Sequence, residues 1–306
     1  DDLHRELKDK GKRNAQRIGV WLARNNLLPD LILCSQVSHI KTTAEKTCKS
    51  AGLSTQNIVI DQNLHKASAK DVIKILKQLK SRVERVLIIA DNAALEDTVS
   101  MLSDKSLPKT KKDSVLLPAS LVHFRINCEW PELTTNCAEA VQVIYPKNLP
   151  LLFPFPDVNS EEERVRPAYY YRQSCVVPYR IKKQKQQVLI ISSSSGKHWV
   201  VPKGIHDPGL SAQASAAKEA YEEAGVDGQV ADTAIGKYEY EKWGAVCTVS
   251  VYPMLVSRVL DDSEWQESHR GRRWVSVKEA SRLIHNKNLA AIIATLPEHV
   301  RLSEDG

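Results

Sequence analysis

A proline-rich segment near the middle of the chain sets the strongest limit on how this sequence can fold. Residues 146–166 read PKNLPLLFPFPDVNSEEERVR, with four prolines followed by an acidic run. Each proline lacks a backbone donor and biases its predecessor toward extended geometry, so we expect little regular structure there. The chain has 306 residues, enough for two hydrophobic cores. We therefore expect two domains, at 1–145 and 166–306, joined by a linker at 146–165.

In the first domain, helical and strand patterns alternate along the chain. Apolar residues recur at helical spacing in some segments, and short apolar runs such as VLIIA at 86–90 indicate buried strands. The predicted helices are 13–24, 42–51, 69–79 and 95–102, and the predicted strands are 30–34, 85–90, 115–124 and 141–145. Alternation of this kind predicts a mainly parallel sheet covered by helices, an α/β fold.

The second domain has a different order of elements, typical of an α+β arrangement. Strand patterns at 169–177 and 187–192 flank a basic turn, and one long helix follows. Further strands are predicted near 236–240, 246–256 and 273–275, and a final helix pair begins near 277. The predicted fold class is therefore α/β and α+β in two domains.

Composition limits the compartment and the partners. The chain is 42% hydrophobic and 26% charged with a net charge of +6, which suits a globular protein and phosphorylated small molecules. Its six cysteines form no CxxC pair, which favours reduced thiols. No apolar run approaches the roughly 20 residues that span a bilayer, and no signal peptide is recognised. We expect a cytoplasmic protein with no membrane association and no stable nucleic-acid partner.

Three glutamates of the long helix point to metal chemistry. Ser211 can cap this helix and Gly225 can end it in a left-handed conformation. Glu219, Glu222 and Glu223 stand at i, i+3 and i+4, so their carboxylates project from one face and repel one another. A hard divalent cation such as Mg²⁺ removes that repulsion and prefers oxygen ligands. The competing interpretation is an ordinary solvated acidic face.

The wider spacing resembles the Nudix box, G-x5-E-x7-R-E-U-x-E-E-x-G-U, in which U is aliphatic. Seven positions agree with it: Gly204, Glu219, Ala220, Glu222, Glu223, Gly225 and Val226. Two positions depart from it. Leu210 stands where the first glutamate is expected, which removes one carboxylate, and Lys218 stands where the arginine is expected. Lysine keeps the positive charge that can orient a neighbouring glutamate, without the bidentate fork of arginine.

The flanking sequence is similar to the diphosphoinositol polyphosphate phosphohydrolase-like branch of the Nudix hydrolases. The similar segments are WVVPKG, GLSAQASAAKEAYEEAGV, IGKYEYEKWG, LDD and RRWVSVKEA. This resemblance implies an α/β/α sandwich, a Mg²⁺ or Mn²⁺ cofactor and a phosphoanhydride substrate. It implies Glu219 and Glu223 as principal metal ligands and Glu222 as ligand or base. The catalytic set that we predict is Glu222, Glu223 and Lys218.

Several other polar residues of this domain are candidates for substrate binding. The predicted set is Lys203, Gly204, Arg272 and Arg273; strand alternation sends only one of the two arginines toward the substrate face. Lys237, Tyr238 and Tyr240 are weaker candidates for the same cleft, since aromatic residues in a strand are more often core. His206 is a weak candidate for a metal ligand or base, and the loop glutamates Glu264 and Glu267 lie where the resemblance allows a general base, although surface glutamates are the simpler interpretation.

The first domain resembles the SixA-type phosphohistidine phosphatases of the histidine phosphatase superfamily. The similar segments are LKDKGKRNAQRIGVWLARNNLLPDLILCS, TTAEKT and IIADNAALEDTVSML. Such enzymes need a nucleophilic histidine in an RHG motif and cations around the phosphate. No RHG triplet occurs, the expected GH is Ala90-Asp91, and His39 replaces an expected arginine. Asp91 would repel a phosphate, so we expect this domain to be inactive.

Three functions are therefore open. The first is a Mg²⁺-dependent Nudix phosphohydrolase that acts on a nucleoside polyphosphate, a dinucleoside polyphosphate or a diphosphoinositol polyphosphate. The second is a regulatory protein that binds phosphorylated ligands without turnover. The third is phosphohistidine phosphatase activity in the first domain.

Overall fold

The computed structural model describes residues 2–103, 107 and 114–304 and separates the chain into two compact units. The first unit is Asp1–Pro167 and the second is Ala168–Gly306. Each unit contains its own sheets and buried clusters. In the described residues, no helix combines the length and the apolar character that a membrane span requires.

The first unit is built on a three-stranded parallel sheet of order β2-β1-β3. Its strands are β1 (Leu31–Cys34), β2 (Ile58–Ile60) and β3 (Val86–Ile89). Its helices are α1 (Asp9–Arg24), α2 (Ser38–Ser50), α3 (Ala69–Lys77) and α4 (Asn92–Leu102). Short 3₁₀ turns lie at Asp2–His4, Thr55–Asn57, Gln62–Leu64 and Trp130–Glu132.

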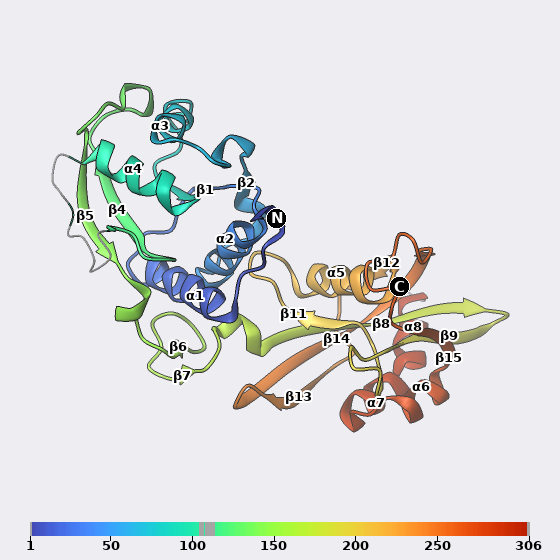
Figure 1. Ribbon diagram of the computed structural model, residues 1–306. Helices are drawn as coiled ribbons and strands as arrows, with labels where there is room; N and C mark the ends of the chain where they lie inside the picture. Colours follow the sequence, from blue (N-terminus) through green and yellow to red (C-terminus); the bar gives the residue numbers. More distant parts are fainter. Residues whose placement is uncertain (1, 104–106, 108–113, 305–306) are drawn as a thin grey trace. The chain divides into compact units, whose positions relative to one another are not determined.

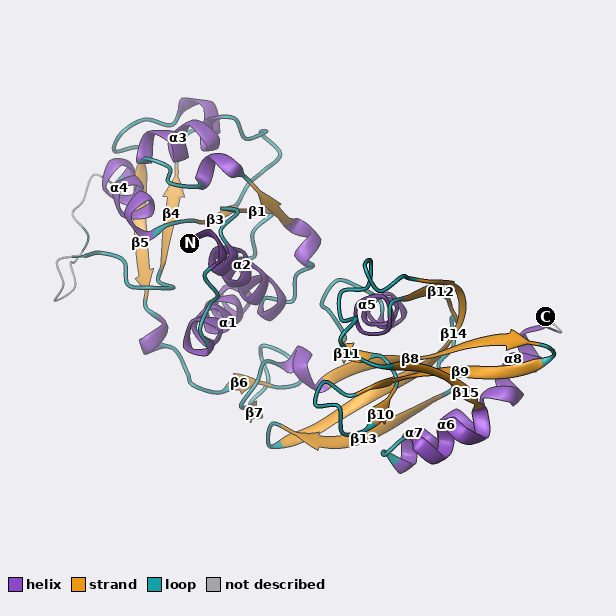
Figure 2. Ribbon diagram, turned by 45° about the vertical axis from the view of Figure 1, so that its right-hand side comes forward, coloured by secondary structure: helices purple, strands orange, loops and turns teal. Residues whose placement is uncertain are grey.

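Strand alternation places helices on both faces of this sheet, as Figures 1 and 2 show. Ile32 of β1 packs with α2, whereas Leu33 packs with α3 on the opposite face. Leu87 of β3 lies on the α1 and α2 side, and Val86 lies on the α3 side. The helix-covered α/β sheet predicted from the sequence is therefore confirmed.

An antiparallel hairpin forms a separate sheet of the first unit. It consists of β4 (Leu121–Ile126) and β5 (Ala138–Ile144). The predicted strand at 115–124 starts too early. Pro118 has no amide hydrogen to give to a ladder, and Ala119 has a positive φ of 61°, so pairing begins only after this turn.

The proline-rich segment contains little regular structure. A 3₁₀ turn at Pro146–Asn148 is followed by two paired strands of two residues each, β6 (Phe153–Pro154) and β7 (Glu163–Arg164). Phe153 is buried, whereas Leu151 is 72% exposed. Leu149 packs against the α1 cluster of the first unit.

The second unit is built on an eight-stranded mixed sheet. Its longer strands are β8 (Arg172–Lys182), β9 (Lys185–Ser192), β13 (Gly236–Lys242) and β14 (Ala245–Val259). The shorter strands are β10 (Trp199–Val200), β11 (Lys203–Ile205), β12 (Val226–Val230) and β15 (Arg272–Ser276). β8 and β14 pair in parallel at the centre, and the other pairings are antiparallel.

Helices cover both faces of this sheet as well, which gives the predicted α/β/α sandwich (Figure 2). The helices are α5 (Ala212–Ala224), α6 (Val277–Leu283), α7 (Lys287–Ala294) and α8 (Leu296–Glu304). Val176 of β8 packs under α5, and its neighbours Cys175 and Val177 pack toward α6 and α7.

Three details of the second unit differ from the sequence expectation. The first strand was predicted at 169–177, but β8 begins only at Arg172, because Ala168–Tyr171 forms a 3₁₀ turn. β12 follows Gly225 directly and was not expected, since its sequence VDGQV is largely polar. The helix pair expected near 277 is followed by a third helix, α8.

Candidate active site

The glutamate helix α5 has a defined cap at each end. Ser211 accepts a hydrogen bond from the Ala214 amide at 3.0 Å, as an N-cap serine does. At the other end Gly225 adopts φ 60° and ψ 41°, the left-handed conformation that ends helices. A Cβ at Gly225 would also collide with Trp265 and Arg272, so this position requires glycine on two grounds.

Glu219 is seated directly against the backbone of β11. A Cβ at Gly204 would overlap the Glu219 carboxylate, so glycine is what lets this carboxylate approach the strand. β11 is fixed in turn by antiparallel pairing of Gly204 with Ser174 of β8. Gly204 therefore leaves room for the Glu219 carboxylate beside β11. This explains on steric grounds why a glycine stands at this position of the motif.

Glu219 is placed where its ionised form is disfavoured. Burial, together with the neighbouring charges of Glu223 and Glu222, raises its pKa to about 7. The repulsion expected from the i, i+3, i+4 spacing is therefore present in the folded unit. A cation at this face would relieve it.

Glu223 is held by two donors. It accepts hydrogen bonds from the Lys203 amide and from Arg270 Nη2, each at 2.9 Å. Burial raises the pKa of Glu223, and these two donors partly oppose that rise. Arg270 also forms an ion pair with Glu267 at 2.6 Å, and its side chain is only 9% exposed. Arg270 was not predicted, because only its place in a basic loop distinguishes it in the sequence.

Lys218 pairs with a carboxylate that the sequence pattern did not indicate. Its Nζ lies 3.0 Å from Asp207 Oδ2. Asp207 is buried, and its amide also donates to Ser215 Oγ. Burial alone would lower the pKa of the Lys218 ammonium, but Asp207, Glu222 and Glu219 raise it. Leu210 supplies no carboxylate, and Asp207 provides the one that Lys218 contacts.

Arg272 and Arg273 point to opposite faces of β15 and already have protein partners. Arg272 donates to the carbonyls of Ala224, Gly225 and Leu260, and its guanidinium lies over the Trp265 ring. Arg273 pairs with Glu279 on the opposite face. Arg272 thus stabilises the carboxyl end of α5, and substrate binding by either arginine stays a prediction.

Lys203 places its amide and its ammonium group in different surroundings. The amide contacts Glu223, whereas Nζ donates to Tyr240 Oη at 2.8 Å, and Tyr240 donates in turn to Gln173. Burial lowers the pKa of the Lys203 ammonium, although the Cys175 and Cys247 thiols and Glu223 oppose this. Phosphate binding by Lys203 stays a prediction.

Most of the weaker candidates make no contact with the carboxylates of α5 in the interactions described. Tyr238 is a core residue, and Lys237 is exposed on β13. His206 contacts the Leu210 carbonyl through Nε2 at 2.7 Å. Glu264 pairs with Arg258, whereas Glu267 joins the site through Arg270.

The donor chemistry of the α5 carboxylates fits a divalent cation. Within the part of the chain that the structure describes, no set of three or more His, Cys, Asp or Glu side chains already forms a metal cage. Mg²⁺ needs no such cage, because it is commonly held by one or two carboxylates together with water and substrate phosphates. Glu219 and Glu223 are close enough to raise the pKa of Glu219, so they suit that mode of binding.

The degenerate phosphatase positions lie beyond the carboxyl ends of two parallel strands. Asp91 follows β3 and precedes α4, where its side chain makes no capping hydrogen bond. His39 lies in the first turn of α2, after β1, and its Nε2 is 3.2 Å from Arg5 Nη2. The ends of parallel strands share one sheet edge, so the two positions belong to the same edge of the first unit.

Comparison with known proteins identifies the second unit. The family model of the NUDIX domain matches residues 171–296. Nudix hydrolase 4 of Arabidopsis thaliana is 36% identical over 129 residues, which cover 38% of this chain and 60% of that protein. Diphosphoinositol polyphosphate phosphohydrolase 2 of Rattus norvegicus is 30% identical over 122 residues, or 39% of this chain and 65% of that protein. Residues 171–296 are therefore a NUDIX domain.

The similarities have a limited extent. The chain spans 60% and 65% of the lengths of these two relatives. A solved structure from Nakamurella multipartitia carries the name phosphohistidine phosphatase SixA. It is 20% identical with a TM-score of 0.42, covering 48% of this chain and 87% of that one. Some Arabidopsis thaliana relatives are named chloroplastic or mitochondrial, so the cytoplasmic compartment stays a prediction.

Proposed function

We propose that the NUDIX domain is a divalent-metal-dependent phosphohydrolase that cleaves a phosphoanhydride bond. The single observation that carries this proposal is the α5 carboxylate cluster, with Glu219 pressed against Gly204 and Glu223 fixed by the Lys203 amide. The proposed substrates are nucleoside polyphosphates, dinucleoside polyphosphates and diphosphoinositol polyphosphates. The relatives named for diphosphoinositol polyphosphate and Nudix hydrolysis support this class.

Each carboxylate has a role that its surroundings suit. Glu219 and Glu223 would hold the cation, Mg²⁺ or Mn²⁺, because both are partly withdrawn from water and lie on one helix face. When bound, the cation supplies charge neutralisation on the phosphate oxygens and acidifies a coordinated water. Glu222 would serve as ligand or as the base that accepts the water proton.

Positively charged side chains would position the substrate and the carboxylates. Lys203 lies beside Gly204 and can exchange its contact with Tyr240 for a phosphate oxygen. Lys218 holds Asp207 at the start of the loop that leads into α5 and would keep the carboxylate face in place. Arg270 would keep Glu223 oriented through the ion pair that it makes.

A hydrolysis screen tests the proposal. The full chain is assayed with Mg²⁺ and with Mn²⁺ against nucleoside triphosphates, dinucleoside polyphosphates and diphosphoinositol polyphosphates. We expect turnover of at least one substrate, and a loss of roughly 100-fold or more in Glu223→Gln. Glu139→Gln is the matched control, because Glu139 lies on β5 of the first unit, outside the NUDIX domain. Turnover that is unchanged in Glu223→Gln contradicts the proposal.

The Arg270–Glu223 ion pair favours binding without turnover as a second candidate function. Arg270 already neutralises a carboxylate that a metal would otherwise bind. On this alternative, a diphosphate raises the unfolding temperature of the protein with no product formed, and chelation of Mg²⁺ does not change that shift. Metal-dependent turnover of the same ligand would exclude it.

We further propose that the first unit has no phosphohistidine phosphatase activity. Asp91 places an anion at the sheet edge where the resemblance expects a phosphate to bind. Release of phosphate from a phosphohistidine peptide by a Glu223→Gln chain, in which the NUDIX domain is disabled, would contradict this.

A further inference from the structure

Two of the six cysteines lie at the loop end of the β4–β5 hairpin in the first unit. Cys128 comes two residues after β4, and Cys137 directly precedes β5. All six cysteines belong to the described residues and are free thiols, and only these two are partly exposed. The accessible thiols of the described chain are therefore gathered at one place.

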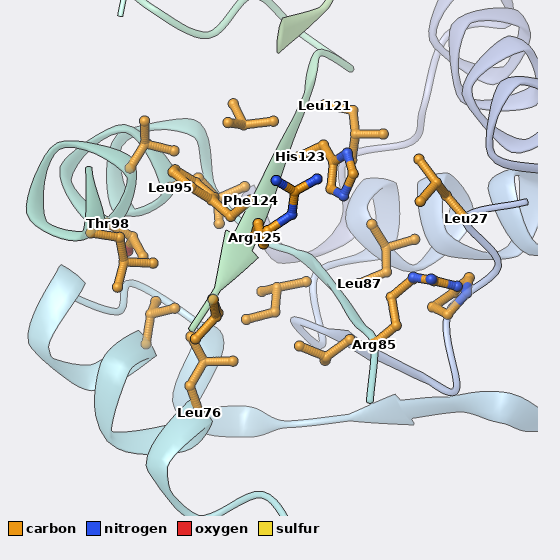
Figure 3. A pocket seen from close by; sticks show the side chains of 18 of the residues that line it. Leu27, Leu76, Arg85, Leu87, Leu95, Thr98, Leu121, His123, Phe124 and Arg125 are labelled. Atoms are coloured by element: carbon orange, nitrogen blue, oxygen red, sulfur yellow. The ribbon is translucent and has the colours of Figure 1, made fainter. Parts of the chain in front are cut away.

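The side chains of the two cysteines lie on the same side of the hairpin. Phe124, Ile126 and Cys128 are alternate residues that pack against one hydrophobic cluster. Figure 3 shows Phe124 on the side of β4 that faces α4, opposite to His123. Cys137 packs against the same cluster as Cys128, and a hydrogen bond joins the two side chains. The two sulfur atoms are therefore neighbours in the folded unit.

The loop between the cysteines is fixed by contacts of its own. Trp130 Nε1 donates to the Val83 carbonyl at 2.6 Å, and the side chain of Leu133 is fully buried. The Asn136 amide donates to the Met101 carbonyl at 2.9 Å. These contacts hold both ends of the loop, so the approach of the two sulfur atoms is a property of the folded hairpin.

The spacing of the two chain segments suits a disulfide. Ile126 pairs with Ala138, within two residues of each cysteine. Paired residues of antiparallel strands have Cα atoms about 4.5–5.5 Å apart. A disulfide joins residues whose Cα atoms are about 4.4–6.8 Å apart. The strands can therefore keep their positions when the two sulfur atoms become bonded.

The other four cysteines are unsuited to thiol chemistry in the folded chain. They are Cys34, Cys48, Cys175 and Cys247, and all four are fully buried. Burial raises the pKa of Cys34 and of Cys48 to about 11 and that of Cys175 to about 12. The thiolate is the reactive form of cysteine, so these side chains stay inert at neutral pH.

The two partly exposed cysteines differ in their surroundings. Cys137 Sγ accepts a hydrogen bond from the Thr134 amide at 3.4 Å, a contact that a thiolate can also accept. Burial raises the pKa of the Cys128 thiol, and the charge of Cys137 and the hydrogen bond between the two side chains raise it further. Glu132 and Glu129 add to this rise. Cys137 is therefore the better attacking group of the two.

We propose that Cys128 and Cys137 form a redox modification site, a dithiol that a low-molecular-weight disulfide converts reversibly into an intramolecular disulfide. The Cys137 thiolate attacks one sulfur of the oxidant, which gives a mixed disulfide and releases one thiolate of the oxidant. The Cys128 thiolate then attacks the Cys137 sulfur and displaces the other half of the oxidant as a second thiolate. The cysteines lose two electrons and two protons, and the oxidant is reduced to two thiols. The new bond closes the loop 129–136.

Oxidised glutathione tests the proposal on the full chain. After oxidation, the remaining thiols are alkylated in the folded state, and the chain is digested with trypsin and a glutamyl endopeptidase. Cleavage after Glu129 or Glu132 separates the two cysteines, so their peptides stay together only through a disulfide. We expect this joined pair, its loss on treatment with dithiothreitol, and alkylation of the four buried cysteines only after denaturation.

Three other products would overturn the proposal. Separate mixed disulfides with glutathione on Cys128 and Cys137 would show that their sulfur atoms do not meet. A covalent dimer of the chain would show that the disulfide forms between two copies. Free thiols at both positions after prolonged oxidation would show that the pair is not a modification site.

Single substitutions test the order of attack. In Cys128→Ser the attacking thiol has no partner, so we expect a stable mixed disulfide at Cys137. Cys137→Ser should react with oxidised glutathione at least about tenfold more slowly. Cys34→Ala changes a buried cysteine of the same unit and should leave the disulfide intact. Equal rates in the two serine variants would overturn the assigned roles, and if a variant does not fold, the peptide map of the unsubstituted chain still decides.

Hydrogen exchange measures how the disulfide constrains the hairpin. Closing a loop removes conformational freedom from the opened state, so opening becomes rarer. We expect amide exchange in β4 and β5 to slow at least about tenfold in the oxidised chain, whereas exchange in β14 of the second unit does not change. A disulfide that leaves exchange in β4 and β5 unchanged would overturn the assigned closure of the hairpin.

Discussion

Arg270 and Glu223 form a nearly buried ion pair across the candidate metal face, with 2.9 Å between Arg270 Nη2 and Glu223 Oε1. Their side chains are 9% and 16% exposed. Glu267 contacts the same guanidinium at 2.6 Å, so one arginine neutralises two carboxylates. The pair connects the loop that precedes β15 to the helix that carries the proposed metal ligands. Because Glu223 belongs both to this ion pair and to the proposed metal site, a change in the pair should affect both metal binding and the stability of the NUDIX domain.

Removal of Arg270 should destabilise the metal-free protein. Arg270→Ala leaves Glu223 and Glu267 without their shared cation, and breaking a buried pair in this way costs about 3–5 kcal/mol. Urea denaturation in a chelator measures the loss. Arg258→Ala breaks the exposed pair with Glu264 and should cost at most about 1 kcal/mol. Equal losses in the two variants would mean that the Arg270 pair is not buried in solution.

Glu219→Gln should stabilise the metal-free protein while it abolishes stabilisation by Mg²⁺. Burial and the charges of Glu223 and Glu222 raise the pKa of Glu219 to about 7, so at pH 8 the folded state bears the full penalty of an ionised carboxylate. A neutral amide removes about 1–3 kcal/mol of that penalty. Thermal unfolding at pH 8, with chelator and with Mg²⁺, measures both effects. A variant that is less stable than wild type in chelator would contradict the assigned repulsion.

Arg272→Ala should lower stability, and its KM tests whether Arg272 also binds the substrate. The side chain donates to three carbonyls at the end of α5, and their loss should cost about 2–3 kcal/mol. Lysine cannot reproduce the planar fork, so Arg272→Lys should recover little of the loss. The hydrolysis assay, run well below the unfolding temperature, separates the two roles. A large rise in KM with unchanged stability would identify Arg272 as a substrate ligand.

The first unit should lose stability in mild acid through His123. Burial, with a smaller contribution from Arg85 and Arg125, lowers the pKa of His123 below its usual 6.5. The unfolded chain therefore binds a proton at His123 more readily than the folded chain does. Neutral His123 costs no stability above pH 6.5, and the folded state loses stability as the pH falls from 6.5 toward the lowered pKa of His123 in the folded state. Urea midpoints between pH 8 and pH 5 should fall less in His123→Gln than in wild type. His299→Gln, which changes an exposed residue of the second unit, should follow the wild type.

Local sequence patterns predicted the elements whose structure depends on neighbours in the chain. The spacing of Glu219, Glu222 and Glu223 sets their common face, and Ser211 and Gly225 set the ends of α5. β4 starts later than predicted because Pro118 and Ala119 form a turn within an otherwise apolar run. The apolar pattern alone could not show that interruption.

Contacts between distant segments could not be predicted in the same way. Arg270 reaches Glu223 from 47 residues away, and nothing in its local sequence separates it from Arg272 and Arg273. Asp207 looked like an ordinary loop residue, because its burial depends on Ser215 and Lys218 after folding. Which strands of the first unit pair with each other is likewise a property that no single segment encodes.

The most direct test of the account is the Mg²⁺ dependence of diphosphate hydrolysis by the full chain and by Glu219→Gln and Glu223→Gln. With the best substrate of the screen, we predict a rate that rises to saturation with Mg²⁺ in the wild type and falls roughly 100-fold or more in each variant. A rate that persists in chelator, or that both variants retain, would contradict the claim that the α5 carboxylates form a catalytic metal site.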